Sequence, residues 1–325
     1  MWTERVNRAG VINAIDPVAR MSSASRMCHP VTLDRRSAAF DGMAHSMQSR
    51  IRTHAKGTRS PMHIDLTGRT ALVTGSTQGI GAAIAAGLAR AGARVAINGR
   101  DEQRVAESVS VLAKDVPGAD LVPLAADVTS EQGAERVAQV LPRVDILVNN
   151  LGIFGSADPL EITDEEWRRY FDVNVLAAVR LTRLYLPGMT ERGWGRVQYI
   201  ASDSAIAIPA EMIHYGMSKT AVLAVSRGFA KKAAGTGVTV NSVIAGPTHT
   251  GGVEDFVYEL VDRDLSWDEA QRAFMRMYRP QSLLQRLIEP EEIAHMVVYL
   301  SSDQASATTG GALRVDGGYV DAILP

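Results

Sequence analysis

Two kinds of apolar segment alternate along residues 62–325. Short runs that are apolar almost throughout and rich in β-branched residues recur at residues 70–73, 94–97, 121–124, 144–148, 196–200, 238–244 and 312–315. Longer stretches of helical character lie between them, among them residues 82–91, 101–114, 164–185 and 215–234. Uninterrupted apolar runs predict strands that are covered on both faces, and regular alternation with helices predicts parallel strands joined by right-handed crossovers. The pattern therefore predicts an α/β fold with a single doubly wound parallel sheet flanked by helices.

The first 61 residues lack this alternation. They hold ten Arg or Lys against four acidic residues, with scattered Ser and His. Three interpretations are open: a disordered basic tail, an organelle transit peptide, which the scarcity of acids favours, or translation that in fact starts at Met62. We expect an N-terminal extension over residues 1–61 and one domain, without an internal repeat, over residues 62–325.

Composition and charge limit the class of protein. The 325 residues are 46% hydrophobic and 22% charged, with a formal net charge of −2. This composition suffices for a large core, and the small net charge provides no strong field for nucleic acid or an anionic membrane. No apolar run reaches the roughly 18 residues of a membrane helix, and the single Cys28 fits a reducing compartment. We expect a cytoplasmic protein with a small-molecule substrate and without nucleic-acid or membrane partners.

A glycine-rich turn follows the first predicted strand and precedes the first predicted helix. Residues 74–81 read Thr-Gly-Ser-Thr-Gln-Gly-Ile-Gly. Glycine permits positive φ and lets a pyrophosphate approach the backbone, and a helix N-terminus adds free N–H groups and partial positive charge. The spacing differs from the Gly-x-Gly-x-x-Gly of other dinucleotide folds. The turn alone therefore leaves a purely structural role open.

Tyr215 and Lys219 stand one helical turn apart in a predicted helix, so both project from one face. A Tyr hydroxyl normally loses its proton near pH 10, and a cation held close to it lowers that pKa. The pair is a candidate proton donor and acceptor for carbonyl or alcohol chemistry. Taken alone, the same spacing also describes an ordinary helix face.

Together and in this order, the glycine turn and the Tyr–Lys pair resemble the short-chain dehydrogenase/reductase family over residues 62–325. Further motifs of that family follow in sequence: Asp127-Val128, Asn149-Asn150-Leu151-Gly152, Asn174, Ser202 thirteen residues before Tyr215, the stretch from Asn241 to Thr250 with Gly246, and Val315-Asp316-Gly317-Gly318. Leu151 replaces a small residue of the family pattern and Ala245 replaces a proline. These departures put the shape of the substrate pocket in doubt more than the activity.

The resemblance implies a Rossmann-type sheet and an NAD(P)(H)-dependent oxidoreductase that transfers hydride between nicotinamide and a carbonyl or secondary alcohol, with a ketone or 3-oxoacyl thioester as substrate. It implies that Tyr215 gives the proton, Lys219 lowers its pKa and holds the nicotinamide ribose, Ser202 binds the carbonyl oxygen, and Asn174 bends its helix and fixes a water. The expected cofactor-binding residues are Gly75, Ser76, Thr77, Gln78, Gly79, Ile80, Gly81, Gly99, Arg100, Asp127, Val128, Asn149, Asn150, Gly152, Tyr215, Lys219, Gly246, Thr248 and Thr250. No metal site is expected, because no His/Cys cluster has ligand spacing.

A different class of function also fits the fold. A non-catalytic dinucleotide-binding regulatory or scaffold protein could use the same sheet. The presence of Ser202, Tyr215 and Lys219 together favours the enzyme.

The end of the second predicted strand bears on the choice of cofactor. An NAD site usually places an acid there to accept from the ribose 2′-hydroxyl, whereas this chain has Gly99 and Arg100. A guanidinium can pair bidentately with a 2′-phosphate, so we expect NADP(H) rather than NAD(H). Two points weigh against this. Arg100 could instead solvate the loop or stack on adenine, and Gln78 stands where NADP-binding relatives often carry a base.

Two further expectations concern the substrate and the assembly. Residues 251–285 cover the substrate in this family, and here their aromatic and Met side chains form either a mobile lid or plain packing. His214 and His249 are expected as pocket wall or loop residues rather than bases. The resemblance implies a homotetramer, with a dimer next, and the stretches 176–186 and 220–229 are apolar on more than one face, as an interface in addition to the core requires.

Overall fold

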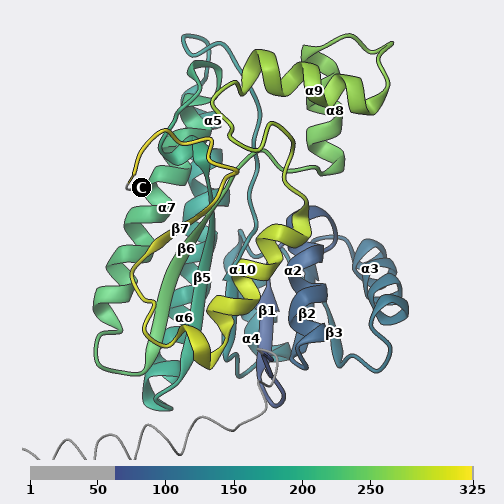
Figure 1. The fold of residues 1–325 in the computed structure, drawn as a ribbon. Coiled ribbons are helices and arrows are strands. Elements are labelled where there is room, and N and C mark those ends of the chain that lie inside the picture. Colours follow the sequence, from purple (N-terminus) through teal and green to yellow (C-terminus); the bar gives the residue numbers. More distant parts are fainter. Residues whose placement is uncertain (1–62, 324–325) are drawn as a thin grey trace, which may run out of the picture. The chain divides into compact units, whose positions relative to one another are not determined.

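The computed structural model describes residues 63–323, and the expectations for residues 1–61 lie outside them. The described chain builds one seven-stranded sheet in the order β3-β2-β1-β4-β5-β6-β7, with every neighbouring pair parallel (Figure 1). The strands are β1 (Thr70–Val73), β2 (Arg94–Gly99), β3 (Leu121–Ala125), β4 (Ile146–Asn149), β5 (Gly195–Ser202), β6 (Val238–Ala245) and β7 (Ala312–Val315). The predicted fold class is confirmed, and each predicted run contributes one strand.

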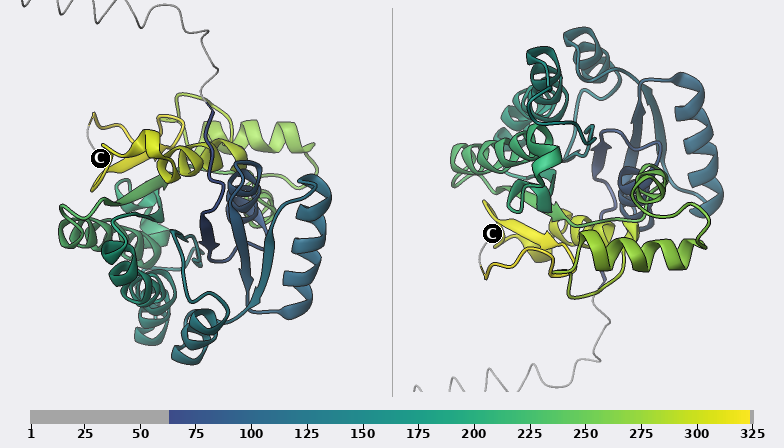
Figure 2. Two further views of the ribbon diagram at one scale, coloured as in Figure 1. Left: turned by 90° about the horizontal axis from the view of Figure 1, so that it is seen from below. Right: turned by 90° about the horizontal axis from the view of Figure 1, so that it is seen from above.

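Helices cover both faces of the sheet (Figure 2). One face carries α2 (Gly79–Arg90), α3 (Glu102–Asp115) and α10 (Pro290–Ser301), and the other carries α4 (Glu131–Val140), α6 (Ala177–Glu191) and α7 (Ile213–Lys232). Successive strand residues serve the two sides: Ala71 and Val73 of β1 belong to the first core and Leu72 to the second. Because both faces are buried, the strands need apolar residues at consecutive positions. This requirement explains the runs seen in the sequence.

The predicted helix over residues 164–185 is interrupted. It consists of α5 (Asp164–Phe171), a π-helical turn (Asp172–Leu176) and α6. Within the π turn, the Asn174 amide bonds outside the helix: Oδ1 accepts from Ile153 N at 2.8 Å and Nδ2 donates to Ile153 O at 3.0 Å. A side chain engaged in this way is one recognised setting for a widened turn at a functional site.

Two helices that cover neither face of the sheet, α8 (Gly251–Leu260) and α9 (Trp267–Tyr278), lie beyond the carboxyl ends of the strands (Figure 1). They share a small core of their own, built around Val257, Phe274 and Met275. The aromatic residues predicted to be either lid or packing therefore pack largely on one another. None of the helices in residues 63–323 is long and apolar enough to cross a membrane.

Candidate active site

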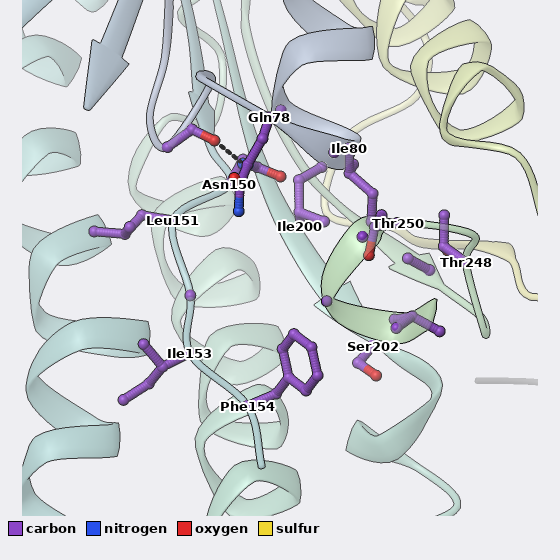
Figure 3. A pocket seen from close by; sticks show the side chains of 18 of the residues that line it. Gln78, Ile80, Asn150, Leu151, Ile153, Phe154, Ile200, Ser202, Thr248 and Thr250 are labelled. Carbon is purple, nitrogen blue, oxygen red and sulfur yellow. Dashed lines mark hydrogen bonds between the residues drawn. The ribbon is translucent and has the colours of Figure 1, made fainter. Parts of the chain in front are cut away.

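A cavity of about 960 Å³ opens at the carboxyl ends of the central strands. The chain reverses its winding between β1 and β4, and in such sheets ligands bind at this point. Of the predicted site residues, all line the cavity except Ser76, Asn149 and Asn174. In Figure 3, Ile80 of the glycine turn lies near Thr250, while Phe154 and Ser202 lie further along the cavity.

The glycine turn is shaped to receive a ligand against its backbone. Gly75 and Gly79 have φ of 61° and 56°, which disfavours side chains larger than hydrogen. A Cβ on Gly81 would stand 2.3 Å from the Gly75 carbonyl oxygen, so this position also excludes a side chain. Gln78 precedes α2 without a side-chain cap, which leaves N–H groups of the first helical turn for an anion. The turn therefore fits the pyrophosphate of a dinucleotide.

Buried and half-buried polar side chains hold this turn in place. Asn150 Nδ2 donates to the carbonyl oxygens of Thr74 and Gly75 at 2.9 and 3.1 Å. Asn98 Oδ1 accepts from Gly75 N at 3.3 Å. The Asn98 Nδ2 donates to two carbonyl oxygens, one near the end of β3 and one just after that strand. Ser76 Oγ donates to Val73 O at 2.8 Å, so its side chain is used in the scaffold and is fully buried. Asn98 was not among the predicted residues. The sequence feature that could have revealed it is an isolated amide in an otherwise apolar strand.

Two arginines line the far end of the cavity. Arg100 follows β2, and Arg104 stands one helical turn later in α3. Both are exposed, and neither side chain bonds to another described residue. Of the two acids between them, Asp101 lines the cavity, and it caps α3 and accepts from Arg104 N at 2.8 Å. The sequence prediction included Arg100 but missed Arg104, which its spacing of four residues could have revealed.

The predicted catalytic pair lies deep in the cavity wall. Lys219 is only 5% exposed, and its Nζ donates to Ile200 O at 2.9 Å and lies 5.7 Å from the centroid of the Tyr215 ring. Burial lowers the pKa of Lys219 to about 8. Burial also raises the pKa of Tyr215, and Asp203 raises it further, while hydrogen bonding with Ser202 acts in the opposite direction. The expected lowering of the Tyr215 pKa is thus reversed here, because desolvation of the phenol outweighs the hydrogen bond.

Asn174 and Asn149 act behind this wall. Asn174 Nδ2 also donates to Ser218 Oγ at 2.9 Å, which ties the π turn to α7 next to Lys219. A Cβ on Gly152 would lie 3.3 Å from Lys219 Nζ and 3.4 Å from Asn174 Oδ1, so the amide oxygen and the ammonium flank the same glycine. Asn149 is buried and donates to Thr182 Oγ1 at 3.3 Å, away from the cavity.

Asp203 is a site residue that the sequence prediction missed. It directly follows Ser202 at the end of β5 and opens the 3-10 turn Asp203–Ala205. Its Oδ1 accepts from Ser202 Oγ at 2.8 Å and from Ser204 N at 2.7 Å. The residue is 6% exposed and lines the cavity, and burial raises the pKa of its carboxyl group.

Aromatic residues close the site on the side of the loop after β4. The Phe154 ring meets Tyr215 edge-on with centroids 6.3 Å apart. His214 packs against Tyr170 at 4.1 Å, burial lowers its pKa, and it lies outside the lining of the cavity. His249 stacks on Trp267 at 4.8 Å, outside the catalytic group. Within residues 63–323, no group of three His, Cys, Asp or Glu side chains is placed to hold a metal ion.

Comparisons with known proteins agree with this geometry. Residues 75–320 match the family described as enoyl-(acyl carrier protein) reductase. The chain is 50% identical over 264 residues to the uncharacterized oxidoreductase YvaG of Bacillus subtilis, across 81% of this chain and 100% of that protein. It is 32% identical over 260 residues to the D-beta-hydroxybutyrate dehydrogenase of Cupriavidus necator, across 78% of this chain and 99% of that protein.

Solved structures show the same likeness. L-sorbose reductase from Gluconobacter frateurii, in complex with NADPH and L-sorbose, matches with a TM-score of 0.76 at 31% identity. The match covers 81% of this chain and 100% of that one.

Proposed function

We propose a reaction for this chain, which belongs to the short-chain dehydrogenase/reductase family and is an NAD(P)-dependent oxidoreductase of CH–OH and C=O groups. In this proposal it reduces a ketone or 3-oxoacyl substrate with NADP(H) and uses Tyr215 as its proton donor. The observation that carries the proposal is the position of Tyr215. Tyr215 is half-buried in the wall of the cavity that begins at the glycine turn, and the buried Ser202 and Lys219 line the same cavity.

The cofactor would be held along the length of the cavity. The glycine turn and the first turn of α2 would receive the pyrophosphate, and Asp127 and Val128 would flank the adenine. Thr250, next to Gly79, and Lys219 would hold the nicotinamide end. When bound, the nicotinamide supplies or accepts the hydride.

The chain's own residues would manage the proton. Because burial raises its pKa, Tyr215 is protonated at neutral pH and can give its proton to the oxygen of the nascent alcohol. Lys219 is protonated below about pH 8 and offsets the negative charge that the phenol acquires. Ser202 Oγ donates to Asp203 Oδ1 in the structure and would turn its proton to the substrate oxygen when a carbonyl group lies beside it.

Preference for NADP(H) follows from the charges at the far end. Arg100 and Arg104 offer two guanidinium groups to a 2′-phosphate. Asp101, which lines the cavity between the two arginines in the sequence, already caps α3 with one oxygen. An L-sorbose reductase with NADPH is among the matching structures, which supports the same choice.

We also propose a homotetramer, with a dimer as the second choice. Apolar residues of the π turn and α6 remain partly exposed, including Leu176 at 37% and Leu184 at 40%. Such residues on the outer side of a helix favour an interface between copies. Light scattering at micromolar concentration measures the mass; a stable monomer would contradict the proposal.

The proposed reaction is tested by absorbance at 340 nm. Purified protein is mixed with NADPH or NADH and a panel of ketones and 3-oxoacyl thioesters, and with NADP⁺ or NAD⁺ and the matching alcohols. We expect consumption of NADPH with at least one ketone. Binding of nucleotide without turnover on any carbonyl or alcohol would favour a regulatory or scaffold role instead.

A further inference from the structure

The carboxyl group of Asp203 has one oxygen in use and one to spare. Oδ1 accepts from Ser202 Oγ, Ser204 N and Ser204 Oγ, so the orientation of the carboxyl group is fixed. Oδ2 accepts no hydrogen bond from any residue in the range 63–323. Oδ2 is also not fully enclosed by protein atoms, in agreement with the 6% exposure of the residue and its place in the cavity lining. The free oxygen is therefore within reach of a molecule in the cavity.

No described cation satisfies this carboxyl group directly. The nearest influence is Arg279, which acts on Asp203 electrostatically without forming a salt bridge within 4.0 Å. The Arg279 guanidinium lies over the rings of Phe274 and Tyr319, at 5.3 and 5.5 Å, and lines the same cavity. A polar oxygen that loses its contact with water and gains no donor costs free energy. A substrate that displaces water from Asp203 Oδ2 would therefore have to supply a hydrogen-bond donor of its own.

The position of Asp203 decides where that donor must lie. Its Oδ1 holds Ser202, and in the proposed function Ser202 faces the reacting oxygen. Because both oxygens belong to one carboxyl group at the cavity wall, a substrate whose reacting oxygen lies at Ser202 would bring the group on its neighbouring carbon toward Oδ2. A hydroxyl group there can donate to Oδ2, whereas the C2 methylene of a 3-oxoacyl thioester has no donor, and a carboxylate would be repelled by the ionised form.

We propose that Asp203 is a specificity residue that accepts a hydrogen bond from a hydroxyl group adjacent to the reacting carbon, so that the substrate is a polyhydroxylated ketone, or a vicinal diol in the reverse direction. This inference rests on the proposed function and narrows its substrate class. Arg279, at the same end of the cavity, supplies donors to oxygens further along such a molecule.

Matched substrates test the inference. With NADPH, kcat/KM is measured for 1,3-dihydroxyacetone against acetone, for 3-hydroxybutan-2-one against butan-2-one, and for the N-acetylcysteamine thioester of acetoacetate. Sites built to bind a substrate hydroxyl reject analogues that lack it, by up to about 10⁴-fold. We expect the hydroxylated ketones to be preferred by at least about 100-fold. Equal or better turnover of the plain ketones or the thioester would overturn the inference and leave the proposed reaction standing.

Variants separate binding from intrinsic reactivity, because a hydroxyl group also activates the neighbouring carbonyl. In Asp203→Ala the ratio of kcat/KM between the members of each pair should fall at least about tenfold, whatever the absolute rates. Asp203→Asn keeps a polar group toward the cavity, so it should keep a larger part of the wild-type kcat/KM ratio than Asp203→Ala does. Asp255→Ala removes an exposed carboxylate that lines the same cavity and should leave the ratio unchanged. If Asp203→Ala lowers both members equally, Asp203 only positions Ser202 and the inference is wrong.

A binding measurement covers the case in which no ketone is turned over. Glycerol and propan-2-ol are titrated calorimetrically into the protein saturated with NADP⁺. Tighter binding of glycerol that is lost in Asp203→Ala would support the specificity role even though the proposed reaction had failed. Equal binding of both alcohols would overturn it.

Discussion

The two ends of the cavity hold their charges in opposite ways. At the adenosine end, Arg100 and Arg104 are exposed and their side chains bond to no other described residue. At the catalytic end, Lys219 is 5% and Asp203 is 6% exposed, and both are fixed by hydrogen bonds to the end of β5 or the turn after it. Exposed charges keep their hydration and contribute modestly, whereas buried charges depend on fixed partners and have shifted pKa values.

The contrast separates the residues that select the cofactor from the residues that carry out the reaction. An exposed guanidinium can be exchanged with little effect on folding, so cofactor preference should respond to single substitutions. The buried groups are coupled to one another, since Asp203 acts on Tyr215 and bonds to Ser202. A change at that end should therefore affect the rate of the reaction or its dependence on pH.

The largest effect expected from the cofactor side comes from backbone shape rather than charge. Gly81→Ala would place a Cβ 2.3 Å from Gly75 O and 2.5 Å from Asn150 Nδ2. Overpacking of this kind costs about 1–3 kcal/mol, or roughly 5- to 150-fold in the Kd for NADPH. Gly228→Ala, which meets no atom within 4 Å, is the control. Fluorescence titration with NADPH measures the Kd; equal affinity in both variants would show that the turn does not bind the cofactor.

At the catalytic end, the charge of Lys219 should set the alkaline limb of the pH profile. Its folded pKa is lowered to about 8, so the ammonium is charged below that pH and neutral above it, while Tyr215, with its raised pKa, stays protonated. The kcat/KM for reduction should therefore fall by about tenfold per pH unit above pH 8. In Lys219→Arg, whose guanidinium stays charged, the fall should move to higher pH. If the alkaline limb of the pH profile does not move in Lys219→Arg, the titration of another group causes it.

Arg100→Asp sharpens the comparison at the exposed end. The carboxylate would replace a charge-assisted pair with repulsion of the 2′-phosphate, and such a pair is worth about 1.5–3 kcal/mol. We expect NADPH to lose at least about tenfold in kcat/KM, while NADH loses little or gains. Steady-state kinetics with both nucleotides measure this. A wild-type preference for NADH, or equal loss with both, would show that Arg100 does not read the phosphate.

The smallest effect is expected from residues 1–61. Because they lack the apolar alternation of the rest, a chain that begins at Met62 should match the full chain in kcat/KM and in Tm. Differential scanning calorimetry and the 340 nm assay measure both. A Tm lower by several degrees would show that this segment stabilises the domain.

The sequence predicted the parts that depend on local pattern. Apolar runs located all seven strands, and the glycine spacing located the turn at Gly75 and Gly81. It missed what depends on neighbours distant in the chain. Asn98 reads as a polar interruption until β3 lies beside it. The family resemblance implied a bend at Asn174, but not that it would be a π turn in which Asn174 bonds to Ile153.

Burial explains the remaining differences. The direction of the Tyr215 pKa reversed because desolvation depends on how the whole cavity wall encloses the phenol. Asp203 was missed because an acid beside a serine has no distinctive spacing. Its role depends on one buried oxygen that bonds to Ser202 and another that remains available.

The most direct test of the account is the single-turnover rate of Tyr215→Phe at saturating NADPH, with the best ketone of the panel. The ring stays and only the proton donor is lost, so hydride transfer should slow by roughly 10²- to 10⁴-fold while the Kd for NADPH stays within about twofold. Tyr258→Phe, in the α8–α9 segment and outside the cavity lining, is the matched control and should behave like the wild type. A Tyr215→Phe rate within about twofold of the wild type would contradict the assignment of Tyr215 as the proton donor.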